Sequence, residues 1–441
     1  MYRVKSYHSE VEYEGPIYDT AEWLNGTSFK NSERANEGIP IIKIAELKDN
    51  ITGKTEFYSG NEKDKYILNK DDLLYSWSGN PETSLDAYFF KLNEGILNQH
   101  IFKISPKKFT SKEYFFYLLN YLKPTLTRIA RDKQTTGLGH VTISDLKELI
   151  IQIPSIETQK SILSILEPIS QKIELNQKMN ETLEEVAKTL FKSWFIDFDP
   201  VRAKAEGKTT GLSKEISDLF PDSFEDSELG EIPKGWKVSK LESIIDVLGG
   251  HAFKSKDYVD NGVFVLRTKN FNKGIAEPLH DDVFLPKSFL DSHQDFICEE
   301  YDYHLVMVGA SLGKTGMIFP SMMPALRNQN MWCFRPREAK FSKLFTKFIV
   351  DTVTKKLLGF ASGSARDFFK KGDFRSHKLV IPPETILESF RSITDPLLTK
   401  KSKNIEETKL ITNLREVLLP KLISGELQIP DSEDSIDEAG V

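Results

Sequence analysis

The second half of this sequence restates the first. IPSIETQKSILSILEP (Ile153–Pro168) aligns with IPPETILESFRSITDP (Ile381–Pro396), and both pairs of prolines fall in register. LNGTSFK (Leu24–Lys30) aligns in the same order with LGGHAFK (Leu248–Lys254). A duplication of this kind predicts a molecule with an approximate two-fold axis. Such a molecule suits a target that also comes in two halves.

Length and composition narrow the class of protein. With 441 residues, 39% of them hydrophobic and 28% charged, the chain is long enough for two or three globular domains. Its two cysteines, Cys298 and Cys333, are too few and too far apart for a disulfide framework or a CxxC metal site. No apolar N-terminal run and no long uncharged apolar stretch is found, so a cytoplasmic protein without contact with membranes is expected. The net charge of -6 argues weakly against nucleic acid, but segments 222–231 and 432–441 supply much of it.

The hydrophobic period divides the chain into two α+β domains joined by long helices. Short strands broken by Gly, Asn and Pro precede an aromatic helix, EYFFYLLNYL, and a last strand, LIIQIP, and the second half repeats this order with LFTKFIVDTV and HKLVIPP. We therefore predict two tandem, pseudo-symmetric α+β domains whose two long helices form an antiparallel coiled coil. The predicted boundaries are 1–153 for the first domain, 154–197 for the central helical spacer, 198–232 for a linker, 233–381 for the second domain, 382–427 for the C-terminal helical spacer and 428–441 for an acidic tail.

A heptad seam with polar members supports the coiled coil. From Pro168, read as a first-turn proline, apolar or small residues recur at alternating steps of four and three, and Asn176 and Asn180 complete the seam. In the second helix Lys401 and Thr408 interrupt the pattern. Asparagines in a seam fix register, and Asn176 and Asn404 occupy equivalent positions at which they can meet. The predicted pairing residues are Asn176, Asn180, Leu183, Leu190, Asn404, Ile411 and Leu418.

The alternative interpretation of this periodicity is that each helix packs only on its own domain. The antiparallel pair is preferred because both helices are long, equivalent and polar on their remaining faces. A helix of about 28 residues spans roughly 40 Å. One turn of DNA is about 34 Å, so such a spacer would hold two DNA readers about one duplex turn apart.

At these residues the chain resembles a known family. Lys172–Gly207 is similar to the central conserved region of specificity subunits of type I restriction-modification systems, and Gly230–Ile244 and Leu418–Leu427 fit the same family. The resemblance covers essentially the whole chain. It implies that each domain reads one half of a split DNA sequence and that the helices form the spacer and dock partner subunits. The first copy lacks the PKGW opening seen at Pro233–Trp236, which leaves the start of the first domain undefined.

Several loops carry side chains suited to DNA. Base edges are read by matching donors and acceptors, whereas Lys, Arg and small hydroxyl residues hold phosphates. For each residue alone, a solvated loop or a structural turn is the competing interpretation, but the candidates occur in both halves. The Asn-Gln pairs at 98–99 and 328–329 are instead interpreted as buried amides that hold each domain together. The candidates are Lys30, Ser76, Ser78, Arg131, Lys133 and His140 in the first half, and Lys254, Ser255, Arg267, Lys269, Asn270, Lys314, Thr315, Arg366, Lys370, Lys371 and Arg375 in the second.

Several motifs resemble catalytic sites, but each lacks a residue or a spacing that the corresponding site requires. GASLGKT (Gly309–Thr315) has one residue too few between its glycines for a phosphate loop and is read as a tight turn after a strand. NPET (Asn80–Thr83) lacks the aromatic residue with which an adenine methyltransferase stacks on a flipped base. Pro221-Asp222 has no ExK partner at nuclease spacing, and the histidines are scattered. No catalytic residue and no metal site is therefore predicted.

Together these features predict a non-catalytic DNA-binding protein, and the resemblance implies a subunit that directs its partners to methylate adenine or cleave DNA. The resemblance implies double-stranded DNA, two modification (methyltransferase) subunits and two restriction (translocase and nuclease) subunits as partners. S-adenosylmethionine, ATP and Mg²⁺ are expected on those partners and no cofactor on this chain. Trp194 and Phe195 are the predicted partner-docking residues, with the alternative that they close the helix against the first domain.

Two other classes remain open on the sequence alone. A solitary DNA-binding module without enzyme partners would not copurify with a methyltransferase. A helical scaffold whose globular ends bind protein would give no salt-dependent binding to duplex DNA. The DNA sequence recognised does not follow from the residues, because base preference depends on loop geometry.

Overall fold

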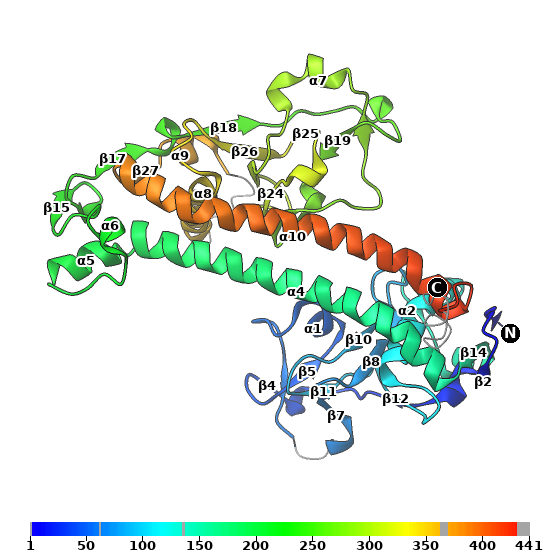
Figure 1. Cartoon of the computed structure of the whole chain (residues 1–441). Coiled ribbons are helices and arrows are strands. Elements are labelled where there is room, and N and C mark those ends of the chain that lie inside the picture. Colours follow the sequence, from blue (N-terminus) through cyan, green and yellow to red (C-terminus); the bar gives the residue numbers. More distant parts are fainter. Residues whose placement is uncertain (1, 61–62, 135–136, 362–368, 430–441) are drawn as a thin grey trace, which may run out of the picture. The chain divides into compact units, whose positions relative to one another are not determined.

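A computed structural model describes residues 2–60, 63–134, 137–361 and 369–429 (Figure 1). The chain divides into two compact units. The first unit consists of Met1–Ile173 and Leu410–Val441, and the second of Glu174–Lys409. Both long helices therefore contribute one segment to each unit.

The first unit is built from several small sheets and one long amphipathic helix. Its four-stranded sheet has the order β10-β8-β12-β3, and a neighbouring five-stranded sheet has the order β4-β6-β5-β11-β7. The elements are β1 (Tyr2–Arg3), β2 (Val11–Pro16), β3 (Ala21–Asn25), β4 (Arg34–Ala35), β5 (Ile39–Ile42), α1 (Ile44–Asp49), β6 (Phe57–Tyr58), β7 (Ile67–Asn69), β8 (Leu73–Ser76), β9 (Ser78–Gly79), β10 (Asp86–Phe89), β11 (Glu94–Leu97), β12 (Ile101–Pro106), α2 (Lys112–Asp132), β13 (Gly139–His140), α3 (Ile143–Glu148) and β14 (Leu149–Pro154).

The second unit has a six-stranded sheet of order β18-β26-β23-β24-β21-β20 and a three-stranded sheet of order β22-β19-β25. The elements are α5 (Asp199–Ala205), α6 (Lys214–Ser217), β15 (Phe224–Ser227), β16 (Gly230–Pro233), β17 (Lys237–Lys240), β18 (Ile245–Gly249), β19 (Val263–Leu266), β20 (Phe271–Asn272), β21 (Gly274–Ala276), β22 (Phe284–Leu285), α7 (Phe289–Ser292), β23 (Tyr303–Val306), β24 (Thr315–Met317), β25 (Ala325–Arg327), β26 (Met331–Pro336), α8 (Lys343–Ala361), α9 (Lys371–Arg375) and β27 (Lys378–Ile381).

The same strand pairings recur in both units. β12 lies between β8 and β3, and β26 lies between β23 and β18, antiparallel in every case. β5 pairs in parallel with β11, as β19 does with β25. β2 pairs antiparallel with β14, as β17 does with β27, so β2 is the counterpart of the strand that follows PKGW in the second copy. The predicted fold class, two tandem α+β domains with long helices, is confirmed.

The core of the first unit lies under α2. Ser111 caps this helix, because its side chain accepts a hydrogen bond from the N–H of Tyr114. Tyr114, Phe115, Leu118 and Leu122 follow at steps of one, three and four and are buried against the four-stranded sheet. In the second unit α8 buries its aromatic face in the same way.

The two long helices fill the predicted spacer ranges, 154–197 and 382–427, and are longer than the predicted length of about 28 residues. α4 runs from Ile156 to Phe195 and contains Pro168 in its interior rather than in its first turn. α10 runs from Glu384 to Ser424. An internal proline costs one hydrogen bond, but Ile162 and Leu166 are buried in the core of the first unit, and this packing holds the helix on the N-terminal side of the proline.

Within the second unit the two helices lie side by side and antiparallel (Figure 1). Polar side chains join them. Asn176 donates through Nδ2 to Glu407 Oε2 at 2.9 Å and to Thr408 Oγ1 at 3.3 Å. Asn404 donates through Nδ2 to Asn180 Oδ1 at 3.0 Å. Asn176 and Asn404 are both buried, but the described hydrogen bonds join each to a different partner. The expected meeting of these two asparagines is therefore wrong, because the antiparallel register places Asn404 opposite Asn180.

Lys401 and Thr408 do not interrupt the seam but belong to it. Thr408 accepts from Asn176, and Lys401 donates to Glu184 Oε2 at 2.9 Å. The apolar residues of the seam are less buried than the sequence pattern predicts. The predicted residues Leu183, Leu190, Ile411 and Leu418 are all partly buried.

The segment predicted as a linker, 198–232, is part of the second unit. It forms α5, α6 and a hairpin of β15 and β16, and Phe198, Val201 and Phe220 are buried in the core of that unit. Aromatic residues at these positions therefore make the segment a packed element, despite the acidic residues between them. The predicted tail, from residue 430 on, lies outside the described residues.

Candidate nucleic-acid interface

A short turn in the first unit is fixed by neighbouring backbone groups. Residues 98–100 connect β11 to β12. The N–H of Trp77 donates to the carbonyl of His100 at 3.2 Å, and the carbonyl of Trp77 accepts from the N–H of Val141 at 2.9 Å. The turn is thus tied to the segments that follow β8 and β13.

The second unit repeats this arrangement bond for bond. Residues 328–330 connect β25 to β26. The N–H of Met307 donates to the carbonyl of Asn330 at 3.2 Å, and the carbonyl of Met307 accepts from the N–H of Phe369 at 2.9 Å. Both turns begin with Asn-Gln, but the third residue and the residue to which the turn is tied, Trp77 or Met307, differ. The two units therefore share the backbone scaffold and only part of its side chains.

In each unit a glycine lies against the backbone of this turn. Gly26 follows β3, and Gly250 follows β18. A Cβ atom on Gly26 would lie 2.0 Å from the carbonyl oxygen of Asn98, and one on Gly250 would lie 1.8 Å from that of Asn328. No side chain fits at either distance, so both positions require glycine. The repeated Gly in LNGTSFK and LGGHAFK therefore has a steric cause.

This close approach predicts a large effect of one methyl group. Gly250→Ala will lower the free energy of unfolding by about 2 kcal/mol, because the added Cβ must displace the backbone at Asn328. Gly249→Ala is the matched control, since a Cβ there meets nothing within 4 Å. Urea unfolding of both variants measures the difference, and equal stabilities would contradict the tight contact.

The side chains at the tips of the turns reach solvent. Gln99, His100, Gln329 and Asn330 are exposed. Trp77 lies against His100 with ring centroids 5.7 Å apart and donates through Nε1 to Asn25 Oδ1 at 2.9 Å. In the first unit amides, an imidazole and an indole thus lie together at the turn, and the turn of the second unit presents two amides. These groups hydrogen-bond to base edges or stack on bases.

The sequence does not single out these glutamines as DNA-binding residues. It suggests that the Asn-Gln pairs are buried amides, and for Gln99 and Gln329 this interpretation is wrong because both lie at turn tips. Asn98 and Asn328 are half-buried. The repeat of Asn-Gln in the two halves is the available signal, but a repeat alone does not say which side of a strand end faces solvent.

Predicted DNA-binding residues of the first half fall into two groups. Ser76 is fully buried, and its hydroxyl accepts from the N–H of Asp86 at 3.1 Å, so its prediction as a DNA contact is wrong. Ser78 and His140 face each other across the β9–β13 pair beside the turn. Ser78 and His140 therefore lie at the exposed edge formed by the turn of residues 98–100.

The predicted cations of the first half are largely paired. Arg131 forms an ion pair with Glu82, and Lys133 forms one with Asp145, which is buried. Lys30 is exposed. Among the described residues no ion pair of Lys30 is found, and a cation without a carboxylate partner is the better phosphate ligand.

In the second half Asn270 is the clearest correction. It is 1% exposed, and its Nδ2 donates to the carbonyl of Glu277 at 3.0 Å and to Asp282 Oδ1 at 2.8 Å, so it closes a turn and is not a DNA contact. Arg267 also donates to Asp282 Oδ1, at 3.3 Å, and Lys269 pairs with Asp281. Both cations are therefore paired with carboxylates, although Lys269 remains exposed.

Other cations of the second half lie near the turn. The N–H of Phe369 donates to the carbonyl of Met307, whose own N–H donates to the carbonyl of Asn330, so Lys370 and Lys371 follow a residue tied to the turn. Partial burial lowers the pKa of Lys371, and the charges of Arg375 and Arg327 lower it further. The glycine-rich segment after β23 is a tight turn, as predicted, in which the N–H of Gly313 donates to the carbonyl of Val306 at 3.0 Å. Lys254, Ser255, Lys314, Lys370 and Arg375 are exposed, Thr315 and Lys371 are half-buried, and Arg366 lies outside the described residues.

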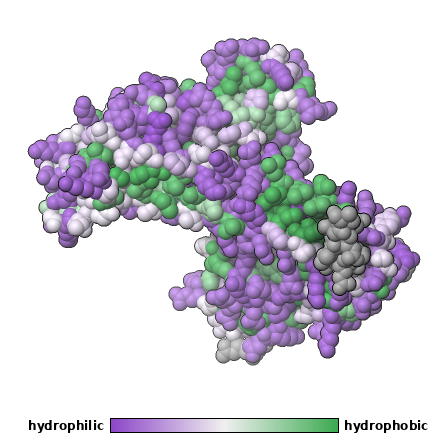
Figure 2. All heavy atoms as spheres, in the orientation of Figure 1, coloured by the Kyte–Doolittle hydropathy of each residue, from purple (hydrophilic) through white to green (hydrophobic). Residues whose placement is uncertain are grey.

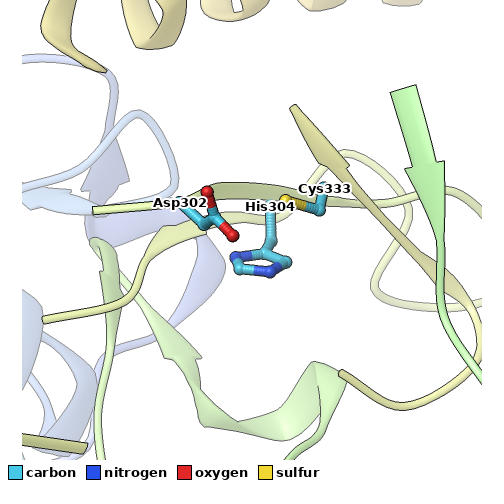
Figure 3. A group of neighbouring side chains, drawn as sticks. All are labelled: Asp302, His304 and Cys333. Carbon is cyan, nitrogen blue, oxygen red and sulfur yellow. The ribbon is translucent and has the colours of Figure 1, made fainter. Parts of the chain in front are cut away.

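A buried cluster of Asp302, His304 and Cys333 has the residue types of a metal site (Figure 3). The carboxylate of Asp302 is already occupied, since it accepts from Arg335 Nη2 at 2.6 Å and from Lys343 Nζ at 3.1 Å. Burial alone would raise the pKa of Asp302, but these cations hold it at about 2. Burial also raises the pKa of the Cys333 thiol, which opposes formation of a metal-binding thiolate.

The first unit contains the counterpart of this cluster as a simple ion pair. Asp72 pairs with Lys103 at 2.7 Å and accepts from the N–H of Asn69 at 2.8 Å. Asp302 accepts from the N–H of Glu299 at 2.8 Å in the same way. In both units the aspartate therefore anchors the start of a central strand, which is a structural role.

The predicted partner-docking residues, Trp194 and Phe195, lie inside the second unit. Trp194 is 1% exposed and Phe195 is 5% exposed, and both pack against Phe390 in the core of that unit. Such side chains offer no surface to another protein. They pack against the second domain rather than the first, because α4 enters the second unit before it ends.

Among the described residues, none of the helices combines the length and apolar character needed to cross a lipid bilayer.

Comparison with known proteins gives a consistent result. Residues 11–185 and 233–407 each match the family model of the type I restriction modification DNA specificity domain. The type I restriction enzyme HindI specificity subunit of Haemophilus influenzae is 28% identical over 420 residues, which covers 82% of this chain and 88% of that protein. The MjaIX specificity subunit of Methanocaldococcus jannaschii is 28% identical over 338 residues, which covers 76% of this chain and 73% of that protein.

A solved structure shares the fold. The crystal structure of a type I restriction-modification system S subunit from M. genitalium aligns with a TM-score of 0.54 and 15% sequence identity, over 94% of this chain and 97% of that one.

Proposed function

This chain belongs to the family of type I restriction-modification DNA specificity proteins, and from this premise we propose that the exposed turn edge of each unit binds one half of a two-part DNA target. The chain is a specificity subunit with two copies of the DNA target-recognition domain, 11–185 and 233–407. Its role is recognition of DNA rather than catalysis.

One observation carries this proposal. The backbone bonds that hold residues 98–100 and residues 328–330 are the same in both copies, and so is the Asn-Gln pair that opens each turn. The third residue of each turn and the residue to which it is tied, Trp77 or Met307, differ. A fixed scaffold with variable side chains is what two readers of different base sequences need, because base edges are distinguished by donor and acceptor pattern.

The family also supports a set of partners. The relatives are named subunits of restriction enzymes, and we propose that this chain assembles with two modification (methyltransferase) subunits and, in the complete enzyme, two restriction subunits. S-adenosylmethionine, ATP and Mg²⁺ would then be bound by those partners. This chain would choose where adenine is methylated or where DNA is cut.

The proposal is tested by mapping N6-methyladenine in the genome of cells that express this chain with its modification subunits. A two-part motif with a constant gap is the expected result. Loss of that motif on deletion of this chain alone assigns it to the specificity subunit. Unchanged methylation after the deletion would reject the proposal.

The cations beside the second turn predict a change in salt dependence. Alanine at Lys370, Lys371 and Arg375 will reduce the slope of log K against log salt by roughly 0.9 for each phosphate that the variant no longer neutralises. Binding to a duplex that carries the methylated motif, measured over a range of salt concentrations, gives this slope.

The matched control replaces three lysines at the edge strand β17 and the turn before it. Lys234, Lys237 and Lys240 are exposed in the same unit, so their alanine variant changes the net charge equally. Its slope should stay close to that of the wild type. Equal slopes for both triple variants would show that the charge beside the turn does not contact phosphate.

A further inference from the structure

The two turns carry one residue in common at their tips. Gln99 and Gln329 follow Asn98 and Asn328 and are exposed in both units. The N–H of Asn98 donates to the carbonyl of Ile42 at 3.2 Å, which fixes the base of its turn. Asn328 donates in the same manner to Leu266, at 2.9 Å. The two glutamines thus project from equivalent, rigid positions.

The next residue differs between the copies. Unit one has His100, whose ring lies against Trp77, whereas unit two has Asn330, whose backbone is in the left-handed region with φ 69°. An imidazole beside an indole and a side-chain amide offer different donors, acceptors and stacking surfaces. This position therefore has the variation that two different half-sites require.

The shared glutamine and the differing residue after it have different consequences for DNA recognition. A residue that is the same in both copies cannot by itself distinguish two different base sequences. It can contact what all duplexes share, the phosphate oxygens, to which a glutamine N–H donates well. Among the described residues no hydrogen bond of the Gln329 side chain is found, so this amide is available to a ligand. Gln99 Nε2 lies 3.2 Å from Nε2 of His100, a contact that uses one N–H of its amide and leaves the other N–H for a phosphate oxygen.

We propose that Gln99 and Gln329 form the same sequence-independent contact with the DNA backbone in each half-site, and that His100 and Asn330 determine which bases each half-site contains. The inference rests on the proposed function and specifies residues for it. It assigns positioning and base reading to adjacent residues of one turn.

Single variants of the full chain, assembled with its modification subunits, separate the two roles. Asn330→Gly keeps the left-handed backbone and removes the amide, and it is expected to relax the second half of the methylated motif while leaving the first half intact. Removal of a base contact should reduce discrimination at that position on the order of tenfold. His100→Ala should relax the first half in the same way.

Gln329→Ala is expected to behave differently. It should weaken binding to the wild-type motif and to unrelated duplex by the same factor, with the methylated motif unchanged. The slope against salt should also be unchanged, because glutamine carries no charge. Asn261→Ala, at an exposed turn elsewhere in the second unit, is the control and should alter neither quantity.

Two results would overturn the assignment. A wild-type motif in the Asn330→Gly and His100→Ala enzymes would remove these residues as base readers, and a changed motif in Gln329→Ala would remove the shared backbone role. Thermal unfolding of each variant establishes that the fold is intact. If the wild-type complex itself yields no motif, the proposed function fails, and this outcome is distinct from both.

Discussion

Replacing Glu184 with glutamine will lower the free energy of unfolding by about 3 kcal/mol, because it leaves two lysines in a poorly solvated site without their anion. Glu184 lies on α4 and joins Lys347 of α8 at 2.7 Å to Lys401 of α10 at 2.9 Å. The side chains of the two lysines are 9% and 14% exposed. One carboxylate thus ties the target-recognition domain of the second unit to both spacer helices.

The network continues into the sheet. Lys347 also pairs with Asp351 at 2.9 Å, and Asp351 accepts a hydrogen bond from the hydroxyl of Tyr303 on β23. Groups that share partners in this way are not independent, so the removal of the Glu184 charge is felt beyond its own contacts. We therefore expect a larger effect than for a surface ion pair.

The pH dependence of the same variant gives a second readout. Burial alone would raise the pKa of Glu184, but Lys347 and Lys401 outweigh it and hold the pKa at about 2, below the ordinary 4.5. A carboxylate with a depressed folded-state pKa stabilises the fold above its unfolded pKa and loses this contribution as pH falls through the folded one. The difference between wild type and Glu184→Gln should therefore shrink from pH 4.5 toward pH 2.

The adjacent Glu185 provides the control. Its side chain is 65% exposed and, among the described residues, forms an ion pair with Lys188 alone, one turn away, so Glu185→Gln should cost less than about 0.5 kcal/mol. Urea unfolding of both variants at neutral pH compares them directly. Equal stabilities would show that the Glu184 network contributes no more than a surface pair.

Aspartate at Leu410, Leu414 and Val417 will abolish assembly with the modification subunit, raising Kd by at least about 100-fold. These three side chains lie at steps of four and three along α10 and are 64%, 48% and 57% exposed. Figure 2 shows a hydrophobic patch over this part of the helix. A contiguous apolar stripe on an otherwise polar helix marks a protein-binding surface.

Under the proposed assembly with modification subunits, we predict that this stripe binds one of them, because the docking residues predicted from the sequence, Trp194 and Phe195, are buried. Copurification of tagged chain and methyltransferase measures the change in assembly. Ile51→Asp, at an exposed apolar position of the same unit, is the control and should assemble normally.

Retention of DNA binding by the triple variant would show that its effect is limited to assembly. Normal assembly of the triple variant would exclude the stripe as the docking surface. If the chain alone is a dimer that the variant converts to a monomer, the stripe instead binds a second copy. Size-exclusion chromatography of the isolated chain distinguishes that case.

Many residues of the candidate site stand out in the sequence because they recur in both halves, but the sequence does not show which of them are exposed. The Asn-Gln pairs, the glycines of LNGTSFK and LGGHAFK, and the seam asparagines all stand out in the sequence. Their roles follow only in part, since the sequence alone places Gln99 and Gln329 inside and Ser76 and Asn270 outside, and the structure reverses all four. The residue type of a polar residue at the end of a strand does not show whether its side chain closes a turn or faces solvent.

The sequence by itself determined the duplication, the two α+β domains and the polar character of the helix pairing, because hydrophobic period and repeated motifs are local properties. Only the tertiary structure decided which side chains reach solvent. Trp194 became core because α4 extends into the second unit, and Lys401 became part of the seam because the antiparallel register places it on Glu184. Burial and register depend on segments far apart in the chain, and these meet only when it folds.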